Sequence, residues 1–426
     1  MALFALVDCN SFYCSCQRVF DPKLADVPIV VLSNNDGCII ARTSEAKALG
    51  IKMAQPYFMA RDIIKKNGVR VFSSNYALYA DMSARAVAVL GQFSPQMEIY
   101  SIDECFLGLE GLEHLDLIDY GHQIRARMLQ WTGLPVCVGI GATKTLAKLA
   151  NHFAKDDKTF NGVCDLRAFT PAQLDERFAQ TPVNDVWGIG RRITAKLKAL
   201  GIHNVRKLRE ANERDLSRRF SVVLERTISE LRGESCLDLE EVAPRRKQIV
   251  CSRSFGHRVQ AIEPIIEAVT TYATRAAEKL RGDGSTAASV AVFAHTNLFR
   301  PDQPTYSAGL TVPLIARTDD TRRLTQAALL GLRAIYKPGY DYIKAGVILM
   351  DLGPKEIHQT SLWETEREPT RAEGLMVALD KINRRMGSGT LTLAGGGIRK
   401  PWQMQRQVMS PCYTTRWSDL PVVHAR

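Results

Sequence analysis

Strand-like apolar runs and helical periodicities alternate along the first part of the chain. Apolar residues that recur every three or four positions predict helices, and short runs rich in β-branched and aromatic residues predict strands. We therefore expect a mixed α/β unit that ends near residue 175. The predicted strands are 4–7, 29–32, 97–102, 106–109 and 136–140, and the predicted helices are 44–49, 78–90, 117–129 and 143–154.

The pattern changes twice further along the chain. Short helical repeats punctuated by glycine predict a small helical domain at 176–243, and a basic, proline-marked stretch at 244–247 predicts a linker. Strand, helix, two strands, helix and strand then follow, which is the β-α-β-β-α-β succession. We expect four domains, at 1–175, 176–243, 244–354 and 355–426, the last without an evident core of its own. The elements of the third domain are predicted at 250–255, 262–280, 288–294, 306–312, 321–336 and 342–350.

Composition narrows the classes of protein. The 426 residues, 46% of them hydrophobic, can form several cores, and a formal charge of +11 favours binding to a polyanion. The ten Cys are scattered without zinc spacing, which indicates free thiols in a reducing compartment. No apolar run is long enough to span a bilayer. We expect a cytoplasmic protein.

Three acids interrupt apolar runs. Asp8 ends the first predicted strand, and Asp103 and Glu104 interrupt another. A buried carboxylate needs a hydrogen bond, a base or a cation, and neither run contains Lys or Arg, which favours a divalent metal such as Mg²⁺. Neighbours on a strand face opposite ways, so Asp103 and Glu104 share a site only at a turn or bulge. On spacing alone, loop capping or pairing with distant bases remains an alternative.

The sequence segments around these acids resemble those of a known protein family. Segments 8–16 and 100–106 resemble the two catalytic motifs of the Y-family, or translesion, DNA polymerases. Within that family the chain is most similar to the UmuC type, the catalytic subunit of bacterial DNA polymerase V. The resemblance covers nearly the whole chain and continues through 31–38, 73–76, 185–190 and 251–256.

The resemblance implies a right-hand fold of palm, fingers, small helical thumb and little finger. It implies an error-prone DNA-directed DNA polymerase that performs translesion synthesis in the SOS response. Two Mg²⁺ ions would be held by Asp8 and Asp103, with Glu104 and the backbone carbonyl of Cys9 completing the metal ligands.

Other residues take implied roles toward the nucleotide. Tyr13 matches the aromatic ring that excludes a ribose 2′-hydroxyl, although a tyrosine here also suits ordinary packing. The amides of Phe12 and Tyr13 could hold phosphate oxygens at a helix start. Lys47 and Lys148 match positions that contact the triphosphate. For Lys144, Lys155 and Lys158 we expect only a solvated helix face.

A helix-hairpin-helix is expected in the thumb. Its glycines, Gly188 and Gly190, allow close approach to a DNA phosphate, which Arg191, Arg192 and Lys196 would neutralise. The nearby bases Lys198, Arg206 and Lys207 likewise lack acids beside them in the sequence.

The last segment implies partners. Gln359, Leu362 and Trp363 resemble the peptide by which bacterial polymerases dock on the sliding clamp. The terminal aromatic region is implied to contact a processed UmuD-type dimer and the RecA filament, or it folds back onto the chain. Its apolar residues are Trp402, Met404, Met409, Tyr413 and Trp417.

Two other functions remain open. The chain could be a noncatalytic DNA-binding regulatory subunit that keeps the polymerase fold, or a nucleotidyl cyclase-like enzyme with a related palm. Primer-template DNA and deoxynucleoside triphosphates are the expected ligands of the leading hypothesis, in a bacterial cytoplasm and close to the nucleoid.

Overall fold

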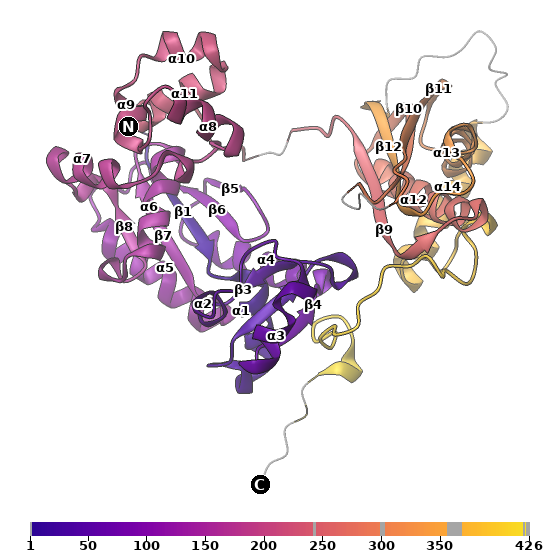
Figure 1. Ribbon diagram of the computed structural model, residues 1–426, viewed down its shortest axis with the longest axis horizontal. Coiled ribbons are helices and arrows are strands. Elements are labelled where there is room, and N and C mark those ends of the chain that lie inside the picture. Colours follow the sequence, from indigo (N-terminus) through magenta and orange to yellow (C-terminus); the bar gives the residue numbers. More distant parts are fainter. Residues whose placement is uncertain (1, 242–243, 299–302, 356–368, 421, 423–426) are drawn as a thin grey trace. The chain divides into compact units, whose positions relative to one another are not determined.

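The chain divides into two compact units, which are described separately. The computed structural model describes residues 2–241, 244–298, 303–355, 369–420 and 422 (Figure 1). The first unit comprises Met1–Ser33, Gly37–Pro244 and Val408–Arg426, and the second comprises Asn34–Asp36 and Arg245–Gln407.

A five-stranded sheet forms the centre of the first unit. Strand β1 pairs antiparallel with β6 on one side and with β7 on the other, while β7 and β8 run parallel. The order across the sheet is β5-β6-β1-β7-β8. The strands are β1 (Phe4–Cys9), β5 (Met97–Ile99), β6 (Glu104–Gly108), β7 (Val136–Gly141) and β8 (Val163–Asp165).

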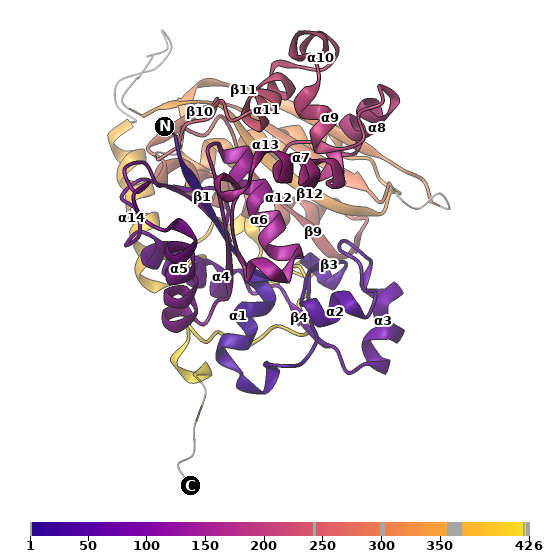
Figure 2. The ribbon, with the colours of Figure 1, turned by 90° about the vertical axis from the view of Figure 1, so that its left-hand side faces the viewer.

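Helices cover both faces of this sheet. The residues of β1 alternate between faces: Val7 packs with residues of α4 (Tyr76–Leu90) and α5 (Leu117–Thr132), whereas Leu6 packs with Ala147 of α6 (Lys144–Asp156). Figure 2 shows α6 lying along β1.

Helix α6 approaches the sheet closely at a glycine. A Cβ at Gly139 of β7 would lie 2.0 Å from the backbone nitrogen of Asn151 in α6, so only glycine fits there. Asn151 in turn donates to the carbonyls of Leu6 (3.2 Å) and Cys137 (2.8 Å). This packing fixes which α6 side chains reach the end of β1.

A second, smaller sheet has the order β3-β2-β4, with β2 antiparallel to β3 and parallel to β4. Its core includes Val30, Ile39 and Ile64. The sequence predicted a helix start at Phe12 and Tyr13, where α1 begins, but its pattern missed β3, β4 and α3; the two strands have only four residues each. The elements of this region are α1 (Phe12–Phe20), β2 (Ile29–Leu32), β3 (Ile39–Arg42), α2 (Ser44–Ala48), α3 (Tyr57–Lys66) and β4 (Arg70–Ser73).

Short helices follow β8 and share one core, which includes Phe178, Leu197 and Ile228. They are α7 (Pro171–Gln180), α8 (Arg191–Ala199), α9 (Val205–Glu210), α10 (Glu213–Arg219) and α11 (Val222–Leu231).

The second unit confirms the predicted β-α-β-β-α-β succession. Its four strands are antiparallel in the order β11-β10-β12-β9, and two helices pack on the sheet. These strands and helices are β9 (Ile249–Val259), α12 (Ile262–Gly282), β10 (Ser285–Thr296), β11 (Ser307–Thr318), α13 (Thr321–Ile335) and β12 (Tyr342–Pro354). The four strands and α12 run longer than the sequence predicted, whereas α13 ends one residue earlier.

The C-terminal segment adds to both units. Helix α14 (Pro369–Met386) buries Met376 and Leu379, and Trp402 joins the core of the second unit. Tyr413 packs against the core of the first unit. All ten Cys are free thiols, as expected. Among the helices of the described residues, none has the length and apolar character that a membrane crossing requires.

Candidate active site

The strand register brings two of the predicted acids together. In the antiparallel pair of β1 and β6, Asp8 stands directly opposite Glu104, so their side chains share one face of the sheet. That is the face covered by α6. Both acids were predicted as metal ligands, and the fold places them side by side.

Asp103 lies in the turn just before β6. The predicted strand 97–102 is wrong at its end, because β5 stops at Ile99. Ser101 accepts hydrogen bonds at its Oγ from the backbone nitrogens of Asp103 (3.3 Å) and Glu104 (3.1 Å), which closes the turn. The backbone nitrogen of Cys9 donates to the carbonyl of Asp103 at 2.9 Å. From the sequence, Asp103 and Glu104 could face one site only at a turn or bulge. The structure has a turn at this point.

Two lysines of α6 reach the acids. Lys155 Nζ lies 2.5 Å from Asp8 Oδ2, and Lys148 Nζ lies 3.0 Å from Glu104 Oε1. The lysines are seven residues apart, two helical turns, so both project from one side of α6. Lys155 is exposed, as expected of a solvated face, but its ion pair with Asp8 was not expected, because the sequence does not reveal that α6 covers this end of the sheet.

Lys148 is also enclosed by aromatic rings. Its Nζ lies 4.4 Å from the ring centroid of Tyr100 and 5.4 Å from that of Trp187, and Trp187 Nε1 donates to the Tyr100 hydroxyl at 3.0 Å. Cation–π attraction adds to the ion pair with Glu104. The ammonium group is thereby held at the acids.

Lys144 departs furthest from the solvated-face expectation. It is buried, forms an ion pair with buried Glu98, and donates to the carbonyl of Asp238 at 2.5 Å. Glu98 also accepts from the backbone nitrogen of Glu240 at 2.7 Å. The pair ties the chain that follows α11 to the sheet. Lys158 is exposed, as expected.

Burial dominates the electrostatics of Asp8. It raises the pKa of this carboxyl from 3.8 to about 7; Lys155 lowers the pKa in part, and the neighbouring Glu104 raises it further. Ionising Asp8 thus remains unfavourable near neutral pH even with Lys155 beside it.

The donor atoms fit Mg²⁺, which prefers carboxylate and carbonyl oxygens. In the described part of the chain, no group of three or more His, Cys, Asp and Glu side chains is arranged as a metal cluster. Asp8 and Glu104 are paired with lysines, and Asp103 accepts from Ser101 Oγ at 2.7 Å. The cost of ionised Asp8 is nevertheless the cost that a bound cation would remove.

The raised pKa predicts how stability depends on pH. Folded Asp8 keeps its proton where the unfolded chain has lost it, so its effect on the free energy of unfolding becomes unfavourable between pH 3.8 and about 7. Asp8→Asn stays neutral throughout. We expect the variant to gain stability relative to the natural chain by about 1 kcal/mol per pH unit across that window and to plateau above it.

Urea unfolding in chelator at several pH values measures this difference. Lys65→Gln, an exposed change on α3, is the control and should show no such trend. A difference between Asp8→Asn and the natural chain that stays constant from pH 4 to 7 would refute the assignment.

Tyr13 lies on the first turn of α1 within a cluster of three tyrosines. Its ring stacks on Tyr79 with centroids 4.3 Å apart, and Tyr76 meets it edge-on at 6.4 Å. Burial raises the pKa of Tyr13. We call Tyr13, Tyr76 and Tyr79 the tyrosine cluster. Tyr79 is fully buried and Tyr13 is half-buried, so the outer face of Tyr13 is available.

The start of α1 leaves backbone donors uncapped by a side chain. Its N-cap residue Ser11 has φ 47° and makes no side-chain cap; its hydroxyl donates instead to the carbonyl of Arg42 at 3.0 Å. The amides of Phe12 and Tyr13 therefore stand at an open, positively polarised helix end. Lys47 is exposed in the last turn of α2.

The two glycines of the predicted helix-hairpin-helix lie directly before α8. Gly188 has φ +84°, a left-handed conformation that favours glycine, and Gly190 caps α8 without a side chain. Arg191, Arg192 and Lys196 are exposed on α8. No acid of the described chain forms an ion pair with Arg191 or Arg192. Arg206 differs from the expectation, because it pairs with Glu210 at 2.9 Å.

Comparisons with known proteins identify the family. Residues 7–152 match the impB/mucB/samB family and residues 246–362 match the C-terminal domain of that family. Protein UmuC of Salmonella typhimurium is 48% identical over 98% of this chain and 99% of its own length, and Protein ImpB of the same species is 46% identical over 99% of each. The chain belongs to the UmuC type of the Y-family DNA polymerases.

Solved structures agree on the fold. A Y-family DNA polymerase chimera of Dbh and Dpo4 superimposes with a TM-score of 0.66 at 19% identity, covering 83% of this chain and 99% of that one. The expected right-hand polymerase fold of mixed α/β domains is thereby confirmed. Residues 373–423 of this UmuC-type chain also match a domain of unknown function.

The remaining predicted positions of this Y-family chain have separate outcomes. Gln359, Leu362 and Trp363 lie outside the described residues. Trp402 and Tyr413 fold back onto the chain, whereas Met409 and Trp417 are exposed, Trp417 to 90%. Met404 is half-buried.

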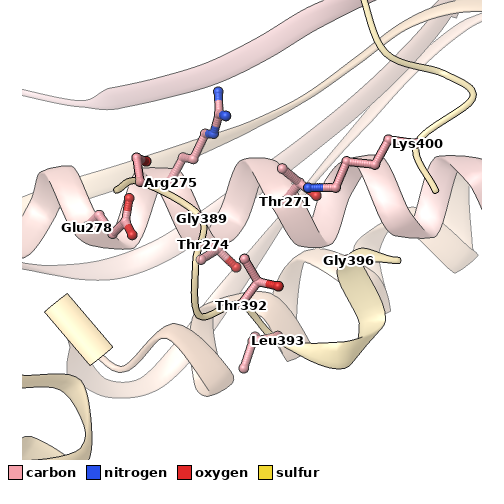
Figure 3. Close-up of a pocket in the computed structure, with 10 residues that line it drawn as sticks. Thr271, Thr274, Arg275, Glu278, Gly389, Thr392, Leu393, Gly396 and Lys400 are labelled. Carbon is pink, nitrogen blue, oxygen red and sulfur yellow. The ribbon is translucent and has the colours of Figure 1, made fainter. Parts of the chain in front are cut away.

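A small pocket of ≈ 30 Å³ lies in the second unit of the polymerase (Figure 3). Its wall comes from α12 and the residues after α14, and no predicted catalytic residue lines it. The lining residues include Thr271, Arg275, Glu278, Thr392 and Lys400.

Sequence reasoning missed several residues of the polymerase site. Lys155, Tyr79 and Asn75 were assigned no role. Lys155 contacts Asp8, Tyr79 stacks on Tyr13, and Asn75 caps α4, the helix that carries Tyr79. Only Asn75 had a local signal, an Asn just before an apolar helix. The others needed the strand register and the helix packing.

Proposed function

We propose that this UmuC-type chain is an error-prone DNA-directed DNA polymerase that copies damaged templates in the SOS response. Its substrates are primer-template DNA and deoxynucleoside triphosphates. The observation that carries the proposal is the placement of Asp8, Asp103 and Glu104 at one end of β1 and β6, beneath two lysines of α6.

Asp8, Asp103, Glu104 and the Cys9 carbonyl would hold two Mg²⁺ ions. Held there, such ions would supply activation of the primer 3′-hydroxyl and stabilisation of charge on the triphosphate. Lys148 pairs with Glu104 and Lys155 pairs with Asp8. Lys155 offsets only part of the cost of ionising buried Asp8.

The nucleotide is positioned by the chain's own donors and rings. The open amides of Phe12 and Tyr13 bind phosphate oxygens, and Lys148 and Lys47 add positive charge to the triphosphate. The ring of Tyr13, backed by Tyr79, stands where a ribose 2′-hydroxyl would collide. These contacts select a deoxynucleotide without reading its base.

Each proposed domain has its own role in binding DNA, the nucleotide or a protein partner. Residues 1–175 form palm and fingers, 176–243 the thumb, 244–354 the little finger and 355–426 the region for protein partners. The clamp peptide at Gln359, Leu362 and Trp363 docks on the sliding clamp. A processed UmuD-type dimer and the RecA filament are the other partners, in a cytoplasmic complex on DNA.

Primer extension tests the proposal directly. The chain with Mg²⁺ should extend a primer on an undamaged template and, with its partner dimer and RecA filament, across an abasic site. Failure to add any nucleotide under all these conditions would favour a noncatalytic DNA-binding subunit. Formation of a cyclic nucleotide without template would favour a cyclase.

The thumb makes a separate prediction about salt. Arg191→Ala with Arg192→Ala removes two exposed charges at the hairpin. If each contacts one phosphate, the slope of log affinity against log salt falls by roughly 2 units for duplex DNA. Fluorescence anisotropy from 50 to 300 mM salt measures the slope.

Arg206→Ala is the matched control for the thumb, because Arg206 is neutralised by Glu210. It should change the slope by less than about half as much. A slope equal to that of the natural chain in the double variant would place the duplex contact elsewhere.

A further inference from the structure

The end of the chain docks on the small sheet of the first unit. The backbone nitrogen of Ser73, at the end of β4, donates to the carbonyl of Val408 at 3.0 Å, and Val408 donates to Ser73 Oγ at 3.1 Å. Ser73 and Met409 form a parallel bridge. Because β4 is an edge strand, Val408 thereby satisfies a backbone donor at the end of β4 that no strand of the sheet pairs.

One buried amide joins this terminal segment to α4. Asn75 accepts at Oδ1 from the nitrogen of Leu78 (3.3 Å), which caps the helix. Its Nδ2 donates to Ser410 Oγ (3.1 Å) and to the carbonyls of Ser410 (3.4 Å) and Pro411 (3.3 Å). Asn75 and Ser410 are both nearly fully buried. Without the terminal segment, the amide would lose every side-chain donor contact that holds it.

A ring stack forms a second anchor, on α1. Tyr413 lies on Phe20 with centroids 4.8 Å apart and an interplanar angle of 6°. Phe20 ends α1, the helix that begins with Phe12 and Tyr13. The terminal segment therefore contacts both helices that carry the tyrosine cluster.

The two helices meet at the tyrosine cluster. Gln17 of α1 donates to the hydroxyl of Tyr79 of α4 at 3.0 Å, and Tyr13 stacks on Tyr79. Any shift of the first turns of α4 relative to α1 would move the backing of Tyr13. Steric exclusion depends on displacements well below 1 Å, since close contacts change energy steeply.

We propose that residues 408–413 act as a positioning element for the sugar-selecting ring of Tyr13. Asn75, Ser410 and Tyr413 are the positioning residues, and they act through α4 and α1. The inference rests on the proposed role of Tyr13. It assigns a task to the last part of the region that matches a domain of unknown function.

Full-length point variants test the inference by the ratio of kcat/KM for a deoxynucleotide to that for its ribonucleotide. Asn75→Asp keeps the helix cap but removes the amide donor, and Tyr413→Ala removes the stack. Each should lower the ratio roughly three- to tenfold. Tyr413→Phe keeps the stack and should restore the natural ratio, and Trp417→Ala, at a 90% exposed side chain, should not change it.

Combination with Tyr13→Ala separates the possible failures. If Tyr13→Ala lowers the ratio, Asn75→Asp should lower it no further in that background. A second possible result is that Tyr13→Ala lowers the ratio while Asn75→Asp and Tyr413→Ala keep the natural ratio. That result would overturn the inference and leave the proposed role of Tyr13 intact. Equal losses for both sugars would overturn it too, because they indicate support of folding. An unchanged ratio in Tyr13→Ala would remove the proposed role of Tyr13 itself.

Discussion

Asp103→Asn lowers template-directed primer extension by about a thousandfold, the largest effect expected of any single change here. The amide keeps the size of the side chain and can still accept from Ser101, so the turn before β6 persists. What is lost is one negative charge at the site that would hold Mg²⁺. Single-turnover incorporation on an undamaged primer-template measures the loss.

The matched control is Asp81→Asn, an acid on α4 that pairs with Arg85 one helical turn away, at 2.8 Å. Such a surface pair contributes little, so activity should stay within about twofold of that of the natural chain. Thermal unfolding of both variants checks that neither loses the fold. Full activity of Asp103→Asn would end the assignment of the carboxylates.

Tyr13→Ala lowers discrimination against ribonucleotides by about a hundredfold. The ring is half-buried against Tyr79, and its loss opens space where the 2′-hydroxyl would collide. Incorporation of the deoxynucleotide should fall much less than incorporation of the ribonucleotide rises. Competing incorporation of a matched pair of triphosphates measures the ratio.

Tyr13→Phe serves as the comparison, because it keeps the ring and removes only the hydroxyl. It should retain most of the discrimination if the exclusion is steric. The same ratio in Tyr13→Ala as in the natural chain would return Tyr13 to the packing role that its place beside the core also allows.

The sequence predicted the large periodic elements well and the short ones poorly. The helix predicted at 143–154 is α6, and the strand at 4–7 is β1, since each has a long enough pattern to reveal its period. Only the start of α1 was expected, because its nine residues give little more than about two turns of periodicity. The strand predicted at 97–102 was too long, because Tyr100 and Ile102 have high β propensity. In the structure β5 ends at Ile99, and Ser101 stabilises a turn.

The sequence identified the acids of the candidate site but not the side chains that contact them. Asp8, Asp103 and Glu104 stood out because acids in apolar runs need compensation. Lys155 and Lys144 looked like residues of a solvated helix face, and only the packing of α6 on β7 at Gly139 brings them to acids. Polar residues on an amphipathic helix carry no local mark of what will lie opposite them.

The sequence by itself determined the family, the order of the elements and the identity of the acids, because motifs and periodicities are local and survive in one dimension. Tertiary structure alone decided that Asp8 faces Glu104, that two lysines of α6 pair with these acids, and that Asn75 holds Ser410 across 335 positions of the chain. Strand register and helix packing join residues that are distant in sequence, and no local pattern encodes which of them will meet.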